Sequence, residues 1–474
     1  MTFSFEDQSG NCDNSYCNND YCYVNDQVGF IGQTKINMRA ANTLLSEVRY
    51  HPAPKMPHAN PDKKERKQMK YVVVVGDGMA DYPVPELGNM TPLQAAHKPN
   101  MDRIAAKGRN GLLRTVPEKL SPGSDVAILS VLGFDPQRFY TGRGPLEAAA
   151  RGIQLMENDV AFRCNLVTEK DGVLVDYSAG HITSREASKL IDALKETCEK
   201  PGEFEFFSGL DYRHFLILRD NLNAQLIECT PPHDAIGAKV SDILPRAKAK
   251  ESEKTVTLLK ETIREAKKIL EAHPVNIARQ KKGKNPGTMI WPWSGGKKPK
   301  MPSFKEMYGL TAAVISAVDL VKGIGVYAGM QVIDVTGATG REDTNYEGKA
   351  DAALKALEDN DLIFVHVEAP DEAGHAKDYK LKVKTIEDLD YRLLGRILES
   401  LKEPYAIAVL PDHPTPVRIG THTKDPVPFA VYSPFLDADG VQKFDEISAR
   451  KGAFGVVEQE HLMALLISSA RSSM

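Results

Sequence analysis

The sequence predicts an α/β fold: a mostly parallel sheet flanked by helices, with a smaller α+β module inserted into it. Short apolar runs rich in β-branched residues recur along the chain, as is typical of strands buried on both faces. These runs are residues 71–75, 361–367, 405–410 and 427–432. Helical patterns lie between them, and this alternation of strands and helices favours a parallel sheet.

The composition is that of a globular protein. The chain has 474 residues, of which 42% are hydrophobic and 26% charged, and its formal net charge is −4. This balance excludes a general polycation, and no apolar run reaches the roughly 18 residues of a membrane span. Six cysteines in so long a chain do not form a disulfide scaffold, and the N-terminus lacks the pattern of a signal peptide. We therefore expect a cytoplasmic protein with neither a nucleic-acid nor a membrane partner, and the sequence leaves the oligomeric state open.

Residues 1–68 differ from the rest of the chain. The first 34 residues contain five acidic residues and no basic one, and prolines and a charged run follow them. We expect a disordered polar extension here: either a flexible tail, or a translation start placed too early with Met69 as the natural beginning. Cys12, Cys17 and Cys22 lack the CxxC pairs or the fourth ligand of a typical metal site.

The remaining chain divides into two parts. We expect residues 69–156 and 245–474 to form the main domain, and residues 157–244 to form the inserted α+β module. In the module, short strand-like segments surround one helix at residues 184–199. Two long helices are expected in the main domain, one around residues 256–270, where apolar residues recur every three or four positions, and one at residues 380–401.

The segment at residues 273–305 is basic. It has eight lysines and arginines, no acidic residue and both tryptophans, Trp291 and Trp293. Basic and aromatic residues together can bind single-stranded nucleic acid. We favour a solvated loop that holds a packed tryptophan pair, or part of the approach for an anionic substrate.

Carboxylate and imidazole residues gather at the ends of the predicted strands. Ligands in α/β proteins bind at the carboxyl ends of parallel strands, so these residues are expected to converge. A single such aspartate is usually a helix cap and a single histidine is usually structural, but six together favour a two-metal centre for phosphoryl transfer. The six are Asp77, Asp371, His375, Asp412, His413 and His422.

Ser124 follows the turn Pro122-Gly123 and begins an apolar helical run. The free amides and the positive dipole end of such a helix can hold a phosphate group. Two interpretations of Ser124 stay open at this point. It is either the N-cap of the helix or a nucleophile that a metal ion or a base activates.

Six motifs in order resemble those of the archaeal-type cofactor-independent phosphoglycerate mutases, which belong to the alkaline phosphatase superfamily. The resemblance covers about residues 69–470 and implies an alkaline-phosphatase-like fold. The motifs are Val-Val-Gly-Asp-Gly-Met-Ala-Asp81, Pro-Gly-Ser-Asp125, Tyr-Thr-Gly-Arg-Gly-Pro-Leu-Glu-Ala148, Asp-Glu-Ala-Gly-His375, Pro-Asp-His-Pro-Thr-Pro416 and Thr-His-Thr-Lys-Asp-Pro-Val-Pro428.

The resemblance implies an isomerase of glycolysis and gluconeogenesis. Ser124 would take the phosphoryl group from 3-phosphoglycerate as phosphoserine, and the reoriented glycerate would recapture it as 2-phosphoglycerate. No bisphosphoglycerate is needed, but two divalent ions are, with Mn²⁺ expected first and Zn²⁺, Co²⁺ or Mg²⁺ as alternatives. The implied ligands are Asp77, Ser124, Asp412 and His413 for one ion, and Asp371, His375 and His422 for the other.

A small phosphorylated carboxylate substrate needs cationic partners, preferably arginines. The candidates are Arg143, Arg163, Lys322 and His181, each of which could instead belong to a surface ion pair. The arginines of the better-known bacterial and plant mutases lie in a different inserted domain and cannot be transferred to this chain. The general acid or base for the glycerate hydroxyls is therefore unassigned.

Three alternative functions stay open. The segments Met-Ile-Trp-Pro-Trp-Ser294 and Asp-Thr-Asn-Tyr-Glu-Gly348 look like a bacterial branch of the family whose members have been proposed to be homoserine kinases. The chain has no GxxxxGK[ST] or GxGxxG phosphate loop, which weakens the kinase interpretation. A metal-dependent phosphatase would need only water in place of the second hydroxyl. A non-catalytic binding module is disfavoured because all six ligand-type residues and Ser124 are present.

Overall fold

The computed structural model describes residues 17–18, 21–22, 69–402 and 404–470. Residues 67–474 form a unit separate from residues 1–66. Within the first unit, β1 (Cys17–Asn18) pairs antiparallel with β2 (Tyr21–Cys22). The expectations for the rest of the extension, and for the three cysteine side chains in it, lie outside the described residues.

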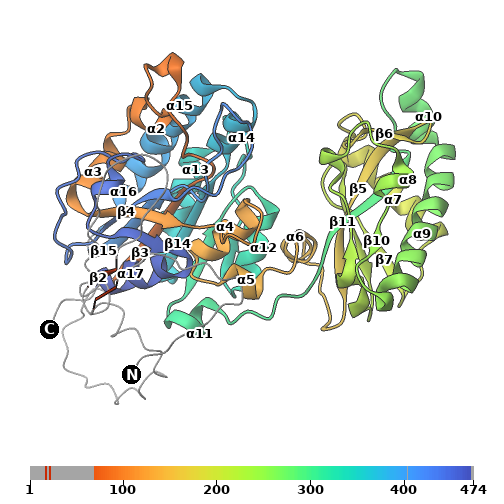
Figure 1. Cartoon of the computed structure of the whole chain (residues 1–474), viewed down its shortest axis with the longest axis horizontal. Helices are drawn as coiled ribbons and strands as arrows, with labels where there is room; N and C mark the ends of the chain where they lie inside the picture. Colours follow the sequence, from red (N-terminus) through yellow and green to blue (C-terminus); the bar gives the residue numbers. More distant parts are fainter. Residues whose placement is uncertain (1–16, 19–20, 23–68, 403, 471–474) are drawn as a thin grey trace. The chain divides into compact units, whose positions relative to one another are not determined.

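The main sheet has eight strands in the order β13-β12-β14-β3-β15-β16-β4-β17. The expected mostly parallel sheet is confirmed, because β12, β14, β3 and β15 run parallel. Figure 1 shows β14, β3 and β15 close together in the main sheet. Only β16 is antiparallel to its neighbours, β15 and β4. The strands are β3 (Lys70–Gly76), β4 (Arg109–Arg114), β12 (Ala312–Ile315), β13 (Gln331–Ile333), β14 (Leu362–Val367), β15 (Tyr405–Leu410), β16 (Val427–Tyr432) and β17 (Gly455–Glu458).

Helices cover both faces of this sheet. The valines of β3 are completely buried and alternate between two cores, since neighbouring side chains of a strand point to opposite faces. Val73 and Val75 pack with α4 (Ser124–Val131), α12 (Asp319–Tyr327) and α17 (Leu462–Ser469). Val72 and Val74 pack with α3 (Pro99–Lys107) and α13 (Tyr346–Asp359). This double burial explains the uninterrupted apolar run in the sequence.

The helix expected at residues 380–401 is not uniform. It consists of α15 (Tyr379–Asp388), a π-helical segment (Leu389–Gly395) and α16 (Arg396–Ser400). The buried carboxylate of Asp390, in the π-helical segment, accepts hydrogen bonds from the amides of Asn100 and Met101 at the start of α3. Among the residues that the structure describes, no helix has the length and apolar character needed to cross a membrane.

A second sheet of five strands has the order β11-β5-β8-β7, with β6 paired to β5. Helices α7 (Ser184–Thr197) and α9 (Glu253–Ala272) share a core with it. The sheet therefore continues past the expected boundary at residue 244, and we propose residues 157–297 as the inserted module. Its strands are β5 (Val160–Lys170), β6 (Val173–Asp176), β7 (Phe204–Phe207), β8 (Arg213–Leu218) and β11 (Met289–Lys297).

The prediction of a loop at residues 273–305 is wrong for much of this segment. It contains α10 (Pro274–Lys281) and β11, which pairs antiparallel with β5. Pro292 and two glycines hide the strand pattern, and a proline is tolerated here because β11 lies at the edge of its sheet. The expected tryptophan packing is present: Trp291 and Trp293 are buried and donate hydrogen bonds to Thr230 O and Asn165 Oδ1.

Candidate metal centre

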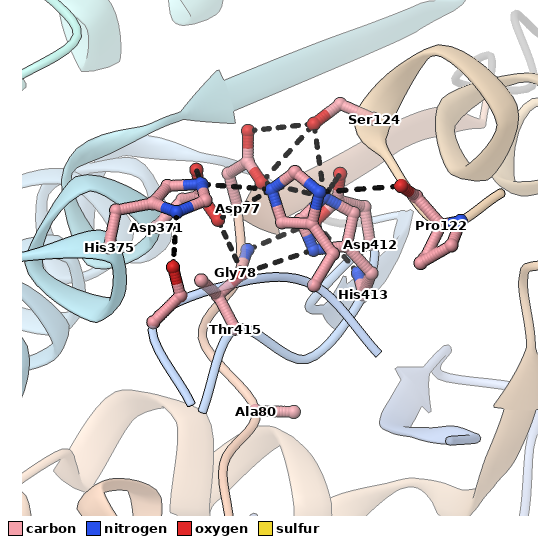
Figure 2. A network of polar contacts seen from close by, with 12 residues as sticks. Asp77, Gly78, Ala80, Pro122, Ser124, Asp371, His375, Asp412, His413 and Thr415 are labelled. Atoms are coloured by element: carbon pink, nitrogen blue, oxygen red, sulfur yellow. Dashed lines mark hydrogen bonds and ion pairs between the residues drawn. The ribbon is translucent and has the colours of Figure 1, made fainter. Parts of the chain in front are cut away.

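The six ligand-type residues lie together at one edge of the main sheet. Figure 2 labels all of them except His422. The central strands are parallel, so the residues that follow β3, β14 and β15 meet at their shared carboxyl edge. His422 precedes its strand, but β16 is antiparallel, so its amino end lies at the same edge. Strand direction thus explains why a residue before one strand joins residues that follow three others.

Ser124 lies beside one group of these residues. Its hydroxyl is 3.2 Å from Asp77 Oδ2 and 3.2 Å from His413 Nε2. The Nε2 atom of His413 is also 3.5 Å from Asp77 Oδ1 and 3.4 Å from Asp412 Oδ2. The other oxygen of Asp412 accepts hydrogen bonds from the amides of Gly78 and His413, which turns its free oxygen toward the group.

The structure excludes one of the two interpretations of Ser124. The N-cap of α4 is Gly123, which has no side chain to cap the helix, and Ser124 is the first helical residue. Its hydroxyl contacts Asp77 and His413, which come from other parts of the chain. The interpretation of Ser124 as an N-cap is therefore wrong, and its hydroxyl lies among the ligand-type residues.

The second group is more open to solvent. The Nε2 atom of His375, at the end of α14 (Ala369–His375), is 3.2 Å from Asp371 Oδ2 and 3.0 Å from His422 Nε2. His422 Nε2 is in turn 3.5 Å from Asp371 Oδ1. The Nδ1 atoms of the two histidines face the carbonyls of Gly420 and Pro122, which only accept hydrogen bonds. Both Nε2 atoms are thus aimed at the same point beside Asp371.

Thr415 contacts a residue of each group. Its hydroxyl hydrogen-bonds Asp371 Oδ1 and lies 3.3 Å from His413 Nδ1. Gly78 packs directly against this contact: its φ is +59°, and a Cβ atom there would lie 2.5 Å from Thr415 Oγ1. The backbone at Gly78 therefore approaches Asp371 and Thr415 more closely than a residue with a side chain could.

The electrostatics of the cluster favour a cation. Burial raises the pKa of Asp77 well above its usual value, and the carboxylates of Asp412 and Asp371 raise it further. The hydrogen bond with Asp371 raises the pKa of His375 to about 9, against the effect of burial. A divalent cation would neutralise the negative charge that these carboxylates bring together.

The spacing of the ligand atoms also fits metal ions. With metal–ligand bonds of about 2.0–2.2 Å, neighbouring ligand atoms in tetrahedral or octahedral shells lie about 3.0–3.5 Å apart. The separations among Asp77, Ser124 and His413, and among Asp371, His375 and His422, fall in this range. Two compact sets of three that can hold an ion are Asp371 with His413 and His422, and Asp77 with His366 and Asp412.

His366 was missed by the sequence analysis. It lies in β14 among apolar residues, where a histidine resembles an ordinary core residue, and it is completely buried. Its Nε2 atom is 3.0 Å from Asp77 Oδ2. Its position could have indicated a role in the site, because His366 is the second-to-last residue of β14 and Asp371 follows that strand closely.

Two of the four expected substrate-binding residues share one carboxylate. Arg163 Nη1 is 3.0 Å from Glu147 Oε1, and the guanidinium lies 4.6 Å from the centre of the Trp293 ring. Arg143, at the start of α6 (Arg143–Ala150), has its Nε atom 3.9 Å from the same Glu147 oxygen. The Nε–H groups of both arginines are buried without a hydrogen-bond partner, so each has a donor available for an anion.

Lys322 and His181 have other partners. Lys322, in α12, forms an ion pair with Asp334. His181 is exposed, and its amide donates a hydrogen bond to Ser178 Oγ. Within residues 69–402 and 404–470, neither is hydrogen-bonded or ion-paired to the six ligand-type residues.

The fold and the site together define an α/β protein in which carboxylates, histidines and a serine form a candidate metal site at the carboxyl edge of the main sheet. Residues 105–276 match the family model of 2,3-bisphosphoglycerate-independent phosphoglycerate mutase. A mutase of that name from Methanosarcina mazei is 52% identical over 405 residues, which are 85% of this chain and 100% of the relative. A Geobacter sulfurreducens protein, named as a probable mutase of this kind, is 48% identical over 84% of this chain and 100% of its own. The chain therefore belongs to the 2,3-bisphosphoglycerate-independent phosphoglycerate mutase family, as the motifs had indicated.

Solved structures agree with this assignment. A cofactor-independent phosphoglycerate mutase from Thermoplasma acidophilum matches with a TM-score of 0.61 and 31% identity, covering 85% of this chain and 100% of the other. A protein from Pyrococcus horikoshii matches with a TM-score of 0.74 and 30% identity, covering 85% of this chain and 97% of its own. The expected fold class is confirmed, and the family is one of mutases, which are isomerases.

Proposed function

We propose that the protein interconverts 3-phosphoglycerate and 2-phosphoglycerate through a phosphoserine at Ser124, without added bisphosphoglycerate. The observation that supports this best is the position of the Ser124 hydroxyl, 3.2 Å from both Asp77 Oδ2 and His413 Nε2. A serine hydroxyl is a weak nucleophile until a neighbouring group takes its proton. Asp77 accepts the hydrogen bond of this hydroxyl, and a divalent cation held by Asp77 and Asp412 would favour loss of the serine proton.

The N-terminus of α4 supports the same step. The apolar residues of this eight-residue helix fix Ser124 at its first position, and Gly123 leaves the first turn without a side-chain cap. Amides and the helix dipole at such an end favour a phosphoryl group. Ser124 would therefore receive the group where the backbone already favours negative charge.

The ligand-type residues would hold two divalent cations. Asp77, Ser124, Asp412 and His413 would hold one, and Asp371, His375 and His422 the other. Bound divalent ions would neutralise phosphate charge and favour the ionised serine. Mn²⁺ is the expected ion and Zn²⁺, Co²⁺ or Mg²⁺ are alternatives, since mixed oxygen and nitrogen ligands suit several of them.

Arg143 and Arg163 would bind the charged ends of the substrate. Both guanidinium groups face Glu147, and each has a buried Nε–H without a hydrogen-bond partner, although Arg143 Nε also lies 3.7 Å from Asp125 Oδ2. A phosphate or carboxylate oxygen would satisfy these donors with charge-assisted hydrogen bonds. The roles of His181 and Lys322 and the cytoplasmic location stay predictions.

The test is an assay of purified protein with Mn²⁺ and 3-phosphoglycerate. Formation of 2-phosphoglycerate without bisphosphoglycerate is expected, with loss of turnover on chelation and in Ser124→Ala. A matched control is Ser130→Ala, because Ser130 lies in the same helix but bonds Thr115 O. Release of free phosphate alone would indicate a phosphatase, and ATP consumption with homoserine a kinase. Either result, without mutase turnover, would contradict the proposal.

A further inference from the structure

His366 belongs to neither ligand set that the family resemblance implies, yet it lies against one of them. It is completely buried, and its Nε2 atom is 3.0 Å from Asp77 Oδ2. This contact does not have hydrogen-bond geometry, so Nε2 has no hydrogen-bond partner. The Oδ2 atom of Asp412, also completely buried, has none either. Two unsatisfied polar atoms thus flank the same carboxylate.

The register of the sheet explains how they meet. His366 of β14 is paired with Val75 of β3, which is paired with Leu410 of β15. Asp77 and Asp412 follow Val75 and Leu410 by two positions, so the strand period places them toward the same face. One ligand atom each of Asp77, His366 and Asp412 lies within 4.8 Å of the other two.

A buried polar atom without a hydrogen-bond partner destabilises the folded state, so a native core rarely keeps two of them side by side. The hydrogen bonds around the imidazole are compatible with a free lone pair on Nε2. Its Nδ1 atom is 3.2 Å from Ser316 Oγ, which can accept the Nδ1–H.

We propose that His366 is a further ligand of the cation held by Asp77 and Asp412. This inference rests on the metal centre of the proposed function and adds a residue to it. Asp77, His366 and Asp412 would then bind the same ion. His366 lies in β14, and Asp77 and Asp412 follow the neighbouring strands β3 and β15. Ser124 and His413 approach Asp77 and Asp412 from outside the sheet, and His413 also lies in a compact group with Asp371 and His422.

The test uses the full chain loaded with Mn²⁺ and counts the imidazole nitrogens coupled to the ions by pulsed electron paramagnetic resonance. His366→Gln is the main variant, because glutamine keeps a polar side chain of similar volume without an imidazole nitrogen. Its spectrum should lose one coupled nitrogen, and calorimetry should show one of the two Mn²⁺ sites weakened at least tenfold. His366→Leu should show the same loss, and either variant suffices if the other does not fold.

The matched control is His214→Gln. His214 is also completely buried with an unpartnered Nε2 atom, but it lies in β8 of the second sheet. This variant should keep the nitrogen count and both affinities. An unchanged nitrogen count in His366→Gln would overturn the proposal, even with weaker binding, because His366 would then only orient Asp77. These readouts do not use turnover, so a failed mutase assay and a failed ligand assignment are distinguishable.

Discussion

Lys382 Nζ lies 2.8 Å from Asp81 Oδ2, and both side chains are completely buried. The same ammonium donates hydrogen bonds to Thr415 O and Ala80 O. It therefore joins the loop after β3, which carries Asp77, to the loop after β15, which carries Asp412 and His413. Figure 2 shows Thr415 beside the ligand-type residues, and Ala80 farther along the segment that carries Gly78. One buried ion pair thus supports the loops that bring the metal-centre residues together.

Replacing this lysine should affect both stability and metal binding. Removing one partner of a buried pair leaves an uncompensated charge and costs about 3–5 kcal/mol. We expect Lys382→Met to lower the free energy of unfolding by this amount, measured by urea denaturation, and to weaken Mn²⁺ binding in calorimetry. Lys98→Met is the control, because Lys98 is nearly buried and paired with Asp102 outside these loops. Equal Mn²⁺ affinities in the two variants would contradict this account.

Gly78→Ala should damage the metal centre through the backbone. The left-handed conformation of Gly78 and its closeness to Thr415 and Asp371 leave no space for a methyl group. Gly88 has a similar φ of +68°, but nothing lies near its Cβ position. Gly88→Ala should cost only about 1 kcal/mol of backbone strain, whereas Gly78→Ala should cost more and also weaken Mn²⁺ binding. Similar unfolding curves and affinities for both variants would show that the contact is unimportant.

Arg163→Leu should weaken substrate binding. A charged hydrogen bond contributes about 1.5–3 kcal/mol, so the KM for 3-phosphoglycerate should rise about tenfold or more. Arg219→Leu is the control, since Arg219 lies in the same module but pairs with Asp159 and Glu205. Steady-state kinetics should show an unchanged KM for this control. A normal KM in Arg163→Leu would place the arginine in an ion pair with Glu147 alone.

His214 should make the protein sensitive to acid. Burial lowers its pKa from 6.5 to about 3, so the folded state holds the ring neutral. A depressed pKa contributes stability that is present above the unfolded value and is lost as the pH falls toward the folded value. Between pH 6.5 and 3 the loss is on the order of 4 kcal/mol. The metal-free wild type should therefore lose stability relative to His214→Asn over this range, and parallel stability–pH curves would rule this out.

The strands of the main sheet and most ligand-type residues were predictable because their signals are local. A strand that is buried on both faces needs a continuous apolar run such as residues 72–75. Asp77, Asp371 and Asp412 each follow such a run within a few residues. Irregular local signals were less informative: Pro292 concealed an edge strand, and a π-helical segment interrupts the helix around residue 390.

The sequence by itself determined the fold class, the family and the residue types of the candidate metal centre, because apolar periodicity and short motifs depend on near neighbours along the chain. Only the tertiary structure decided how those residues meet. His422 reaches the cluster because β16 is antiparallel, and His366 faces Asp77 because β14 and β3 pair in one register. Strand direction and register are set by packing between distant segments, so neither is visible in any local stretch of sequence.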